Sequence, residues 1–324
     1  MIQDVKVFGF GIAEQLQKHV NCEVDGHPLW ASRFLYSDPD AVYNTYMDFL
    51  RAGSQIISTI TYQASVEGFM ENFNVSRQEA IGLMKKAVEL AQKAVNDYKQ
   101  EVKGRDVPNP EPLIAGSIGS YAAFLHDGSE YSGPAYAKEQ SLDYIVAWHE
   151  ARILTLLDAG VDFLAFHLMP SVKEVIALIE YLKSIPSAKA WFTFSCKTDG
   201  QSIVDGNNFK DSIINCYKTA NHKQLIGLGL NCLPPKIMTP FIKSISQKEI
   251  GISIPLVAYP NSGEIYSKET SSWLPKSDDY GPEKFVGEWL DMGVRFIGGC
   301  CRTTDKDIHT FTQEVHKWKN NCSL

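Results

Sequence analysis

The chain has 324 residues, of which 44% are hydrophobic and 21% are charged, and its formal net charge is −7. This composition can bury a large core, and an acidic chain without a run of Lys and Arg is not expected to bind nucleic acid. The longest apolar stretches, such as Phe163 to Met169, are too short to cross a bilayer, so no membrane partner is expected. The first residues also lack the charged-then-apolar order of a signal peptide, which favours a cytoplasmic enzyme.

Short apolar runs alternate along the chain with amphipathic stretches. Nearly continuous apolar runs that are bounded by polar, Gly or Pro residues are typical of parallel strands buried on both faces. Eight runs fit this description: Val5 to Gly11, Ile56 to Tyr62, Pro112 to Gly119, Phe163 to Pro170, Ala190 to Cys196, Gln224 to Cys232, Pro255 to Asn261 and Arg295 to Cys301.

Helical patterns fill the intervals between these runs. The clearest pattern covers Arg77 to Val102 and begins at the capping-box sequence Ser76-Arg77-Gln78-Glu79. Other helical patterns cover Leu142 to Ala159 and Val172 to Ser184, and further ones follow Asp211, Pro235, Pro282 and Asp305. Eight strands that alternate with helices predict an α/β fold, a (β/α)8 TIM barrel, as a single domain over residues 1–324.

The structural alternative is a doubly wound open sheet. It is the weaker interpretation because no Gly-x-Gly-x-x-Gly follows the first predicted strand. The polar stretch Lys268 to Pro282, which contains Trp273 and Tyr280, is expected to be a loop that forms a lid over the barrel mouth.

The seven cysteines are scattered and odd in number, which argues against a disulfide framework. Cys22 and Cys322 lie in polar terminal contexts and are expected to have no special role. Cys216 lies within a helical pattern and is expected to be a small core residue. The other four cysteines all stand at the ends of predicted strands.

In a (β/α)8 barrel the active site lies at the carboxyl ends of the strands. Cys232 ends the sixth predicted strand, and Cys300 and Cys301 end the eighth, so the three sulfurs can converge on one rim. The preceding Gly298-Gly299 pair is expected to let the backbone turn sharply or approach a ligand closely. Zinc prefers thiolate ligands, and three protein ligands with an open fourth position are typical of a catalytic zinc site.

Two further residues are candidates for a fourth ligand. Cys196 ends the fifth predicted strand and His167 lies near the end of the fourth. A simpler interpretation also stands: Cys232 is an ordinary buried strand residue and Cys300-Cys301 is an incidental pair, because free cysteine is often simply buried.

Several motifs together resemble one family over nearly the whole chain. They are Thr61-Tyr62-Gln63-Ala64-Ser65, Ala115-Gly116-Ser117-Ile118-Gly119, Asp127-Gly128-Ser129-Glu130-Tyr131, Asn231-Cys232, Tyr259-Pro260-Asn261-Ser262-Gly263-Glu264 and Gly298-Gly299-Cys300-Cys301-Arg302-Thr303. The set resembles the homocysteine S-methyltransferases, which include betaine-, S-methylmethionine- and folate-dependent enzymes.

This resemblance implies that Cys232, Cys300 and Cys301 are catalytic through a bound Zn2+, with the homocysteine sulfur at the fourth position. The thiolate would attack the methyl group of a cationic donor, S-methylmethionine or S-adenosylmethionine, and give methionine. The implied partners are therefore a small-molecule thiol and a cationic methyl donor. The protein itself is expected to be a monomer or a small homo-oligomer. The implied substrate-binding residues are Tyr62, Gln63, Ser117, Gly119, Tyr131, His167, Asn231, Asn261 and Glu264. The aromatic candidates for the donor cation are Tyr62, Tyr131 and Trp273.

The chain departs from the family pattern at two acidic positions. On the first strand the acidic residue falls on Gly9 if the chain is aligned at Leu16, and on Phe8 if it is aligned at Glu14. On the fourth strand His167 replaces a glutamate. By resemblance these two acids would bind the homocysteine ammonium group, so homocysteine is not assured as the thiol.

Three interpretations of His167 stay open. It can be a satisfied rim residue in an enzyme with eroded activity, or it can recognise another group, such as the carboxylate of a thiol without an amino group. Alternatively, Glu14, Glu264 or another acid takes over the ammonium, because a neutral imidazole offers one acceptor and a protonated one repels a cation. A diverged zinc-binding paralogue without catalysis is the functional alternative, and redox chemistry at Cys300-Cys301 is a weaker one.

Overall fold

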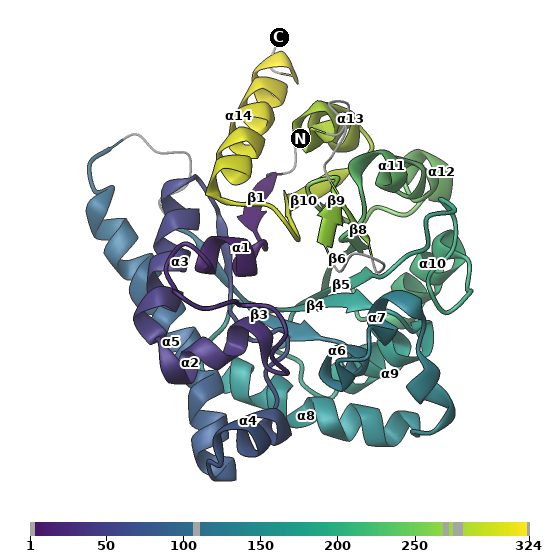
Figure 1. The fold of residues 1–324 in the computed structure, drawn as a ribbon. Coiled ribbons are helices and arrows are strands. Elements are labelled where there is room, and N and C mark those ends of the chain that lie inside the picture. Colours follow the sequence, from purple (N-terminus) through teal and green to yellow (C-terminus); the bar gives the residue numbers. More distant parts are fainter. Residues whose placement is uncertain (1–3, 106–110, 268–271, 275–280, 323–324) are drawn as a thin grey trace.

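Eight parallel strands close into a barrel that is ringed by helices (Figure 1). The computed structural model describes residues 4–105, 111–267, 272–274 and 281–322. Around the barrel the strands follow the order β1-β10-β7-β6-β5-β4-β3-β2. Their bounds are β1 Lys6–Gly9, β2 Ile56–Ser58, β3 Leu113–Gly119, β4 Phe163–Met169, β5 Ala190–Phe194, β6 Leu225–Asn231, β7 Leu256–Tyr259 and β10 Val294–Gly299. The predicted (β/α)8 barrel is therefore confirmed, and the open-sheet alternative is wrong because β1 pairs with both β2 and β10.

Each predicted strand is present, but most strands end before the predicted residue. Tyr62, Cys196, Cys232, Asn261 and Cys301 lie beyond the last paired residue of their strands. Polar rim residues leave the ladder because the chain must turn there toward the next helix. The candidate site residues therefore stand on the rim loops as well as on the strands.

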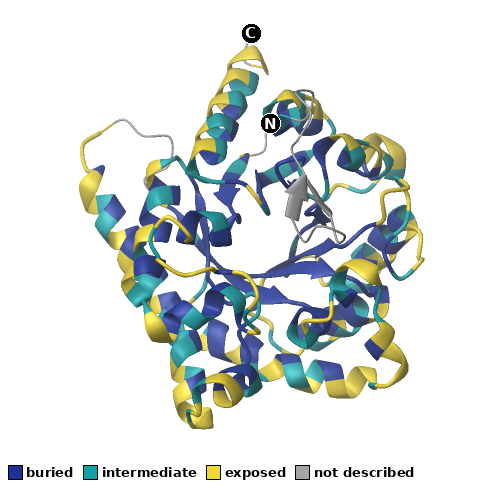
Figure 2. Cartoon of the chain, in the orientation of Figure 1, coloured by how far each residue is buried: buried dark blue, intermediate teal, exposed yellow. Residues whose placement is uncertain are grey.

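Helices cover the outside of the barrel, and their exposed residues face away from it (Figure 2). The predicted helices over Arg77 to Val102, Leu142 to Ala159 and Val172 to Ser184 are found as α5, α8 and α9, and the Ser76 capping box is formed. The α-helices are α1 Ile12–Leu16, α2 Phe34–Ser37, α3 Pro39–Arg51, α4 Val66–Phe73, α5 Arg77–Glu101, α6 Tyr121–Leu125, α7 Ser129–Ser132, α8 Leu142–Asp158, α9 Val172–Leu182, α10 Phe209–Thr219, α11 Pro235–Ser244, α12 Gln247–Ile250, α13 Val286–Asp291 and α14 Asp305–Cys322. Among the described helices none combines the length and the apolar character that a membrane crossing requires.

The predicted lid over Lys268 to Pro282 is described only in part. Its segment β9 (Ser272–Leu274) pairs antiparallel with β8 (Ile265–Ser267), so this part is a strand and not a loop. Residues 268–271 and 275–280, and the side chain of Trp273, lie outside the described residues.

The strands alternate between two hydrophobic layers. On β4, Leu164 and Phe166 pack toward the helices, whereas Phe163 and Ala165 belong to the cluster inside the barrel. Because side chains alternate along a strand, His167 also faces the interior. The core between sheet and helices thus fixes the barrel, and the inner layer forms the floor of the candidate site.

The same alternation decides which residue of β1 faces the site. Phe8 lies inside the barrel, 5.1 Å from both the Trp191 and Tyr259 rings. Gly9 faces outward, since a Cβ atom there would come within 2.4 Å of the Phe49 ring of α3. The alignment at Leu16, which places the family's acidic residue at Gly9, is therefore inconsistent with the structure. A side chain at this position would point away from the site.

Gly298 and Gly299 both stay within β10, so the sharp turn, one of the two roles expected for this pair, is not found there. A Cβ atom on Gly298 would lie 2.3 Å from the Phe8 carbonyl oxygen and 2.9 Å from its ring. A Cβ atom on Gly299 would lie 2.3 Å from Thr303 Oγ1. Neither glycine has a positive φ; that conformation occurs at Arg302 instead. The glycines thus serve the close packing of β10 against its neighbours.

We therefore expect Gly298→Ala to lower the free energy of unfolding by about 1–3 kcal/mol, because the added methyl group overpacks the barrel interior against Phe8. Urea denaturation followed by circular dichroism measures this change. Gly82→Ala in α5 is the matched control, because its Cβ atom would meet nothing within 4 Å. Alanine there should leave stability unchanged or raise it. Equal effects of the two substitutions would contradict the packing role of Gly298.

Candidate metal centre

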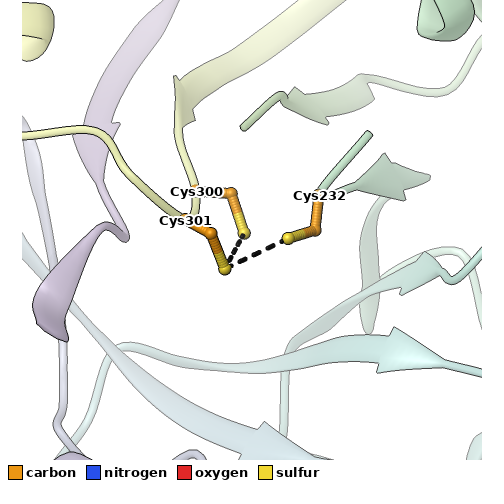
Figure 3. A group of neighbouring side chains, drawn as sticks. All are labelled: Cys232, Cys300 and Cys301. Carbon is orange, nitrogen blue, oxygen red and sulfur yellow. Dashed lines mark hydrogen bonds between the residues drawn. The ribbon is translucent and has the colours of Figure 1, made fainter. Parts of the chain in front are cut away.

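Three cysteine sulfurs meet at the carboxyl ends of β6 and β10 (Figure 3). The Sγ atom of Cys301 lies 3.2 Å from that of Cys232 and 4.0 Å from that of Cys300. All three sulfurs lie within 4.8 Å of one another. The structure thus brings together the three residues that the sequence selects as zinc ligands.

Hydrogen bonds of the main chain hold both cysteine segments against the end of β7. The Cys232 N–H donates to the Tyr259 carbonyl oxygen at 3.0 Å, and the Cys300 N–H donates to that of Pro260 at 2.8 Å. Cys232 itself has a φ of 61°, which turns the chain out of β6. Non-glycine residues rarely adopt this conformation because it strains the backbone. The surrounding structure therefore offsets a cost in folding free energy at Cys232.

The three thiols are unequal in their protonation. Hydrogen bonds from Cys300 and Cys301 hold the pKa of the Cys232 thiol well below its usual range. Burial raises the pKa of Cys300, and the hydrogen bond to Cys232 raises that of Cys301. Without a cation, therefore, one thiolate is shared by two thiols. A divalent cation among the sulfurs would allow all three to ionise, so this donor set fits a soft metal ion such as Zn2+.

Two neutral groups contact the sulfurs from the sides. The Asn231 Nδ2 atom lies 3.7 Å from Cys300 Sγ, while its Oδ1 atom accepts a hydrogen bond of 3.1 Å from the Leu168 N–H. The Tyr131 hydroxyl lies 3.8 Å from Cys232 Sγ. Asn231 is therefore held with its amide N–H groups toward the sulfur, where they stabilise negative charge.

Neither additional ligand candidate joins the sulfur group. Within the described residues, only Cys232, Cys300 and Cys301 form a cluster that could hold a metal ion. The Cys196 thiol faces the Phe194 carbonyl oxygen, and the His167 Nδ1 atom is hydrogen-bonded to the Tyr259 hydroxyl. The two candidates for a fourth ligand, Cys196 and His167, therefore do not extend the cluster of three cysteines.

Of the predicted substrate residues, Ser117 and Gly119 lie on β3, and Tyr62 and Gln63 lie in the segment between β2 and α4. The hydroxyls of Tyr62 and Ser117 are buried and have no hydrogen-bond partner in the described structure. Gly119 lies against Tyr62, where a Cβ atom would come within 2.6 Å of the Tyr62 carbonyl oxygen. The Gln63 amide instead donates to the Ala123 carbonyl oxygen at 3.0 Å, which turns it toward α6.

The two predicted substrate residues of the loop after β7, Asn261 and Glu264, form different hydrogen bonds. Asn261 donates to the Cys232 carbonyl oxygen at 3.4 Å and accepts from the Gly263 N–H at 2.9 Å. Glu264 accepts a hydrogen bond of 2.8 Å from Arg302. Asn261 therefore supports the backbone of a metal-ligand candidate, and Glu264 is paired with the residue that follows the cysteine pair.

Arg152 of α8 supports the site and escapes the sequence analysis. It is buried, and its guanidinium donates to the carbonyl oxygens of Gly119 at 2.9 Å, Tyr62 at 2.8 Å and Thr61 at 3.3 Å. The carbonyls of Thr61 and Tyr62 belong to the loop after β2, and that of Gly119 belongs to the last residue of β3. A charged residue on the apolar face of the predicted helix is the signal that could have identified it, because an arginine is seldom fully buried without partners.

We expect Arg152→Leu to lower the free energy of unfolding by about 3 kcal/mol or more, because several buried carbonyls lose their donor. Chemical denaturation measures the loss. Arg105→Leu, at an exposed position after α5, is the control and should change stability little. If both leucine variants unfold at the same denaturant concentration, Arg152 does not support the rim as described.

Comparison with known proteins assigns the chain to a family. Residues 7–315 match the homocysteine S-methyltransferase family. A betaine-homocysteine S-methyltransferase of Drosophila melanogaster is 42% identical over 92% of this chain and 90% of its own length. The homocysteine S-methyltransferase of Escherichia coli (strain K12) is 34% identical over 94% of each chain.

A solved structure agrees with these sequence matches. The metallated form of the Escherichia coli homocysteine methyltransferase MmuM superposes with a TM-score of 0.81, at 32% identity over 96% of both chains. The family match covers both cysteine segments of the sulfur cluster and the strands that position them. On the fold, the converging cysteines and these similarities, the chain belongs to the homocysteine S-methyltransferase family.

Proposed function

We propose that this chain is a zinc-dependent S-methyltransferase that moves a methyl group from a cationic donor to a thiol. Homocysteine is the proposed thiol and methionine the product, and S-methylmethionine or S-adenosylmethionine is the proposed donor. The observation that carries this proposal is the group of three cysteine sulfurs within 4.8 Å of one another at the barrel rim. The names of the similar proteins support the same reaction class.

Cys232, Cys300 and Cys301 would hold the zinc ion. When bound, Zn2+ would lower the pKa of a thiol at its open position, so that the thiol is an electron-rich nucleophile near neutral pH. Three thiolates around one divalent cation leave a net charge of about −1 by simple counting, which keeps the metal a weak Lewis acid.

The protein's own residues hold the three cysteine sulfurs in place. Cys300 is only 2% exposed, and Asn231 directs its amide toward this sulfur. Burial keeps water away from the sulfurs, and an N–H group aimed at Cys300 stabilises its charge without reorganisation during the reaction. The backbone bonds from the β7 loop keep the cysteine segments in one arrangement. The barrel thus contributes orientation, which is the main requirement for an in-line methyl transfer.

The donor is proposed to bind beside the aromatic rings that neighbour the sulfurs. The Tyr131 hydroxyl is 3.8 Å from Cys232 Sγ, and Tyr62 packs against the inner cluster that contains Cys232 and Cys300. Aromatic faces and a net negative sulfur cluster both favour a sulfonium or a quaternary ammonium cation. A transferable methyl group on such a cation is the electrophile that a thiolate requires.

One observation favours a second candidate, a diverged zinc-binding paralogue with another thiol or without catalysis. The inward positions that neighbour the sulfurs on β1 and β4 carry Phe8 and His167, and neither is a carboxylate. A buried ammonium group normally requires an anion or several hydrogen bonds. Binding of homocysteine therefore separates the two candidates.

We expect the purified protein to carry about one zinc per chain, as a three-thiolate site implies. Cys232→Ser and Cys301→Ser should each lose most of this zinc, because serine hydroxyls are not ionised at neutral pH. Elemental analysis after dialysis measures the stoichiometry. Cys196→Ser is the matched control, a buried strand-end cysteine outside the cluster, and it should retain the zinc.

The reaction is tested with the zinc-loaded protein. Methionine should form from homocysteine with S-methylmethionine, S-adenosylmethionine or betaine, and the donor that gives the highest kcat/KM identifies the natural class. Zinc-loaded protein that forms no methionine with any of these donors would overturn the proposed activity in favour of the paralogue.

A further inference from the structure

One buried carboxylate of α9 is hydrogen-bonded to three other parts of the chain. Glu174 is 1% exposed, and its Oε1 atom accepts from the Tyr121 N–H at 3.0 Å and lies 2.9 Å from His149 Nε2. Its Oε2 atom accepts from the Tyr136 hydroxyl. Burial and the Glu174 carboxylate raise the pKa of Tyr136, so this hydroxyl keeps its proton and stays a donor. A buried carboxylate is costly without such partners, and the network therefore specifies where each partner lies.

Two partners of Glu174 stand at the ends of residues 121–136, here called the rim segment. Tyr121 is the first residue of α6, shortly after β3, and Tyr136 lies in the 3-10 helix η2 (Ala135–Lys138). Their rings lie 5.3 Å apart, between centroids, so the rim segment returns close to its starting point. One carboxylate thus holds both ends, the first through a main-chain N–H and the second through a hydroxyl.

The start of the rim segment is also held from α8. His149 and Arg152 are buried and lie about one turn apart on this helix, so both reach the same side of it. Arg152 donates to the Gly119 carbonyl oxygen at 2.9 Å, while Glu174 accepts from the N–H of Tyr121. The guanidinium and the carboxylate therefore fix the two sides of the turn that leads from β3 into α6.

The middle of the rim segment brings Tyr131 to the sulfur cluster. Tyr131 lies in α7, and its hydroxyl is 3.8 Å from Cys232 Sγ. This helix is a single turn, which is too short to be stable without tertiary contacts. Gly128 and Gly133 stand on either side of it with φ values of 74° and 114°, a conformation that glycine adopts most readily. The position of Tyr131 therefore depends on how the ends of the rim segment are held.

We propose that Glu174 is a positioning residue for the methyl transfer, because it holds both ends of the rim segment and thereby sets the place of Tyr131 beside Cys232. The inference rests on the proposed function, in which the cationic donor binds beside the Tyr131 ring. Within the described residues, the hydrogen bonds of the Glu174 side chain go only to the rim segment and to α8. Glu174 thus acts through Tyr131. A displaced rim segment would leave the buried carboxylate without its donors, which disfavours other arrangements.

The place of Tyr131 is tested by fluorine NMR on the full chain, with 3-fluorotyrosine replacing Tyr131 alone. Glu174→Gln keeps the size of the side chain but presents an N–H group in place of one acceptor oxygen, so we expect the fluorine signal to move or broaden. Glu180→Gln, at an exposed position of the same helix, is the matched control and should leave the signal unchanged. An unchanged signal in folded Glu174→Gln would overturn the proposal.

The effect on catalysis is tested by steady-state kinetics in both substrates. Glu174→Gln should raise the KM of the cationic donor by about tenfold, the order expected when a cation loses one aromatic face. The KM of homocysteine should change little. Tyr136→Phe removes one of the three contacts and should act in the same direction, but less. Circular dichroism confirms that each variant is folded, and equal changes in both KM values would contradict a role through Tyr131.

A double variant shows whether Glu174 acts through Tyr131. Tyr131→Leu removes the ring beside Cys232, so adding Glu174→Gln to it should raise the donor KM no further. Effects that remove the same interaction are not additive, whereas independent effects add. Additive effects of the two substitutions on the donor KM would overturn the positioning role.

The outcomes separate this inference from the proposed function. If wild-type protein forms methionine while Glu174→Gln changes neither the fluorine signal nor the donor KM, the positioning role is wrong and the methyltransferase stands. If wild-type protein forms no methionine with any donor, the proposed function fails, and the role of Glu174 in methyl transfer fails with it. A moved fluorine signal together with a selective rise in the donor KM supports both.

Discussion

Parallel pairing between β1 and β10 closes the barrel, and the candidate site depends on this closure. The register places Phe8 opposite Gly298 and Gly9 opposite Gly299. Because Gly298 has no side chain, the Phe8 ring fits inside the barrel, and β10 can deliver Cys300 and Cys301 to the same rim as Cys232. A side chain at Gly298 would push these two strands apart and separate the sulfurs.

Buried polar groups around the sulfurs divide into two kinds. Arg152 and Asn231 have their hydrogen bonds satisfied by the protein, so they fix the rim loops and the orientation of Cys300. Tyr62 and His167 each keep a buried polar atom without a partner. Satisfied groups give rigidity, whereas unsatisfied ones lower stability unless a ligand completes them. Tyr62 packs against the inner cluster that contains Cys232 and Cys300, and the ring of His167 lies 6.5 Å from that of Tyr62.

Charge explains why this site suits a thiol and a cationic donor. Hydrogen bonds from Cys300 and Cys301 lower the pKa of Cys232, whereas burial raises the pKa of Cys300 and the hydrogen bond to Cys232 raises that of Cys301. A divalent cation would allow all three to ionise and would leave a slightly negative cluster. The neighbouring aromatic faces and the neutral His167 add no positive charge. In the proposed reaction, a methyl donor that carries a positive charge would therefore meet a favourable field.

The sequence by itself determined the barrel, because eight buried apolar runs between amphipathic stretches fit few other folds. It also singled out the three cysteines that the structure brings together, since Cys232 and the Cys300-Cys301 pair stand at strand ends. The tertiary structure decided what a linear alignment leaves open. It showed that Gly9 faces the Phe49 ring and that Phe8 faces the site, because the alternation of side chains is fixed only once the register of β1 is known. It also brought His167 of β4, Thr193 of β5 and Tyr259 of β7 together, because only the fold places their polar atoms in one chain of hydrogen bonds.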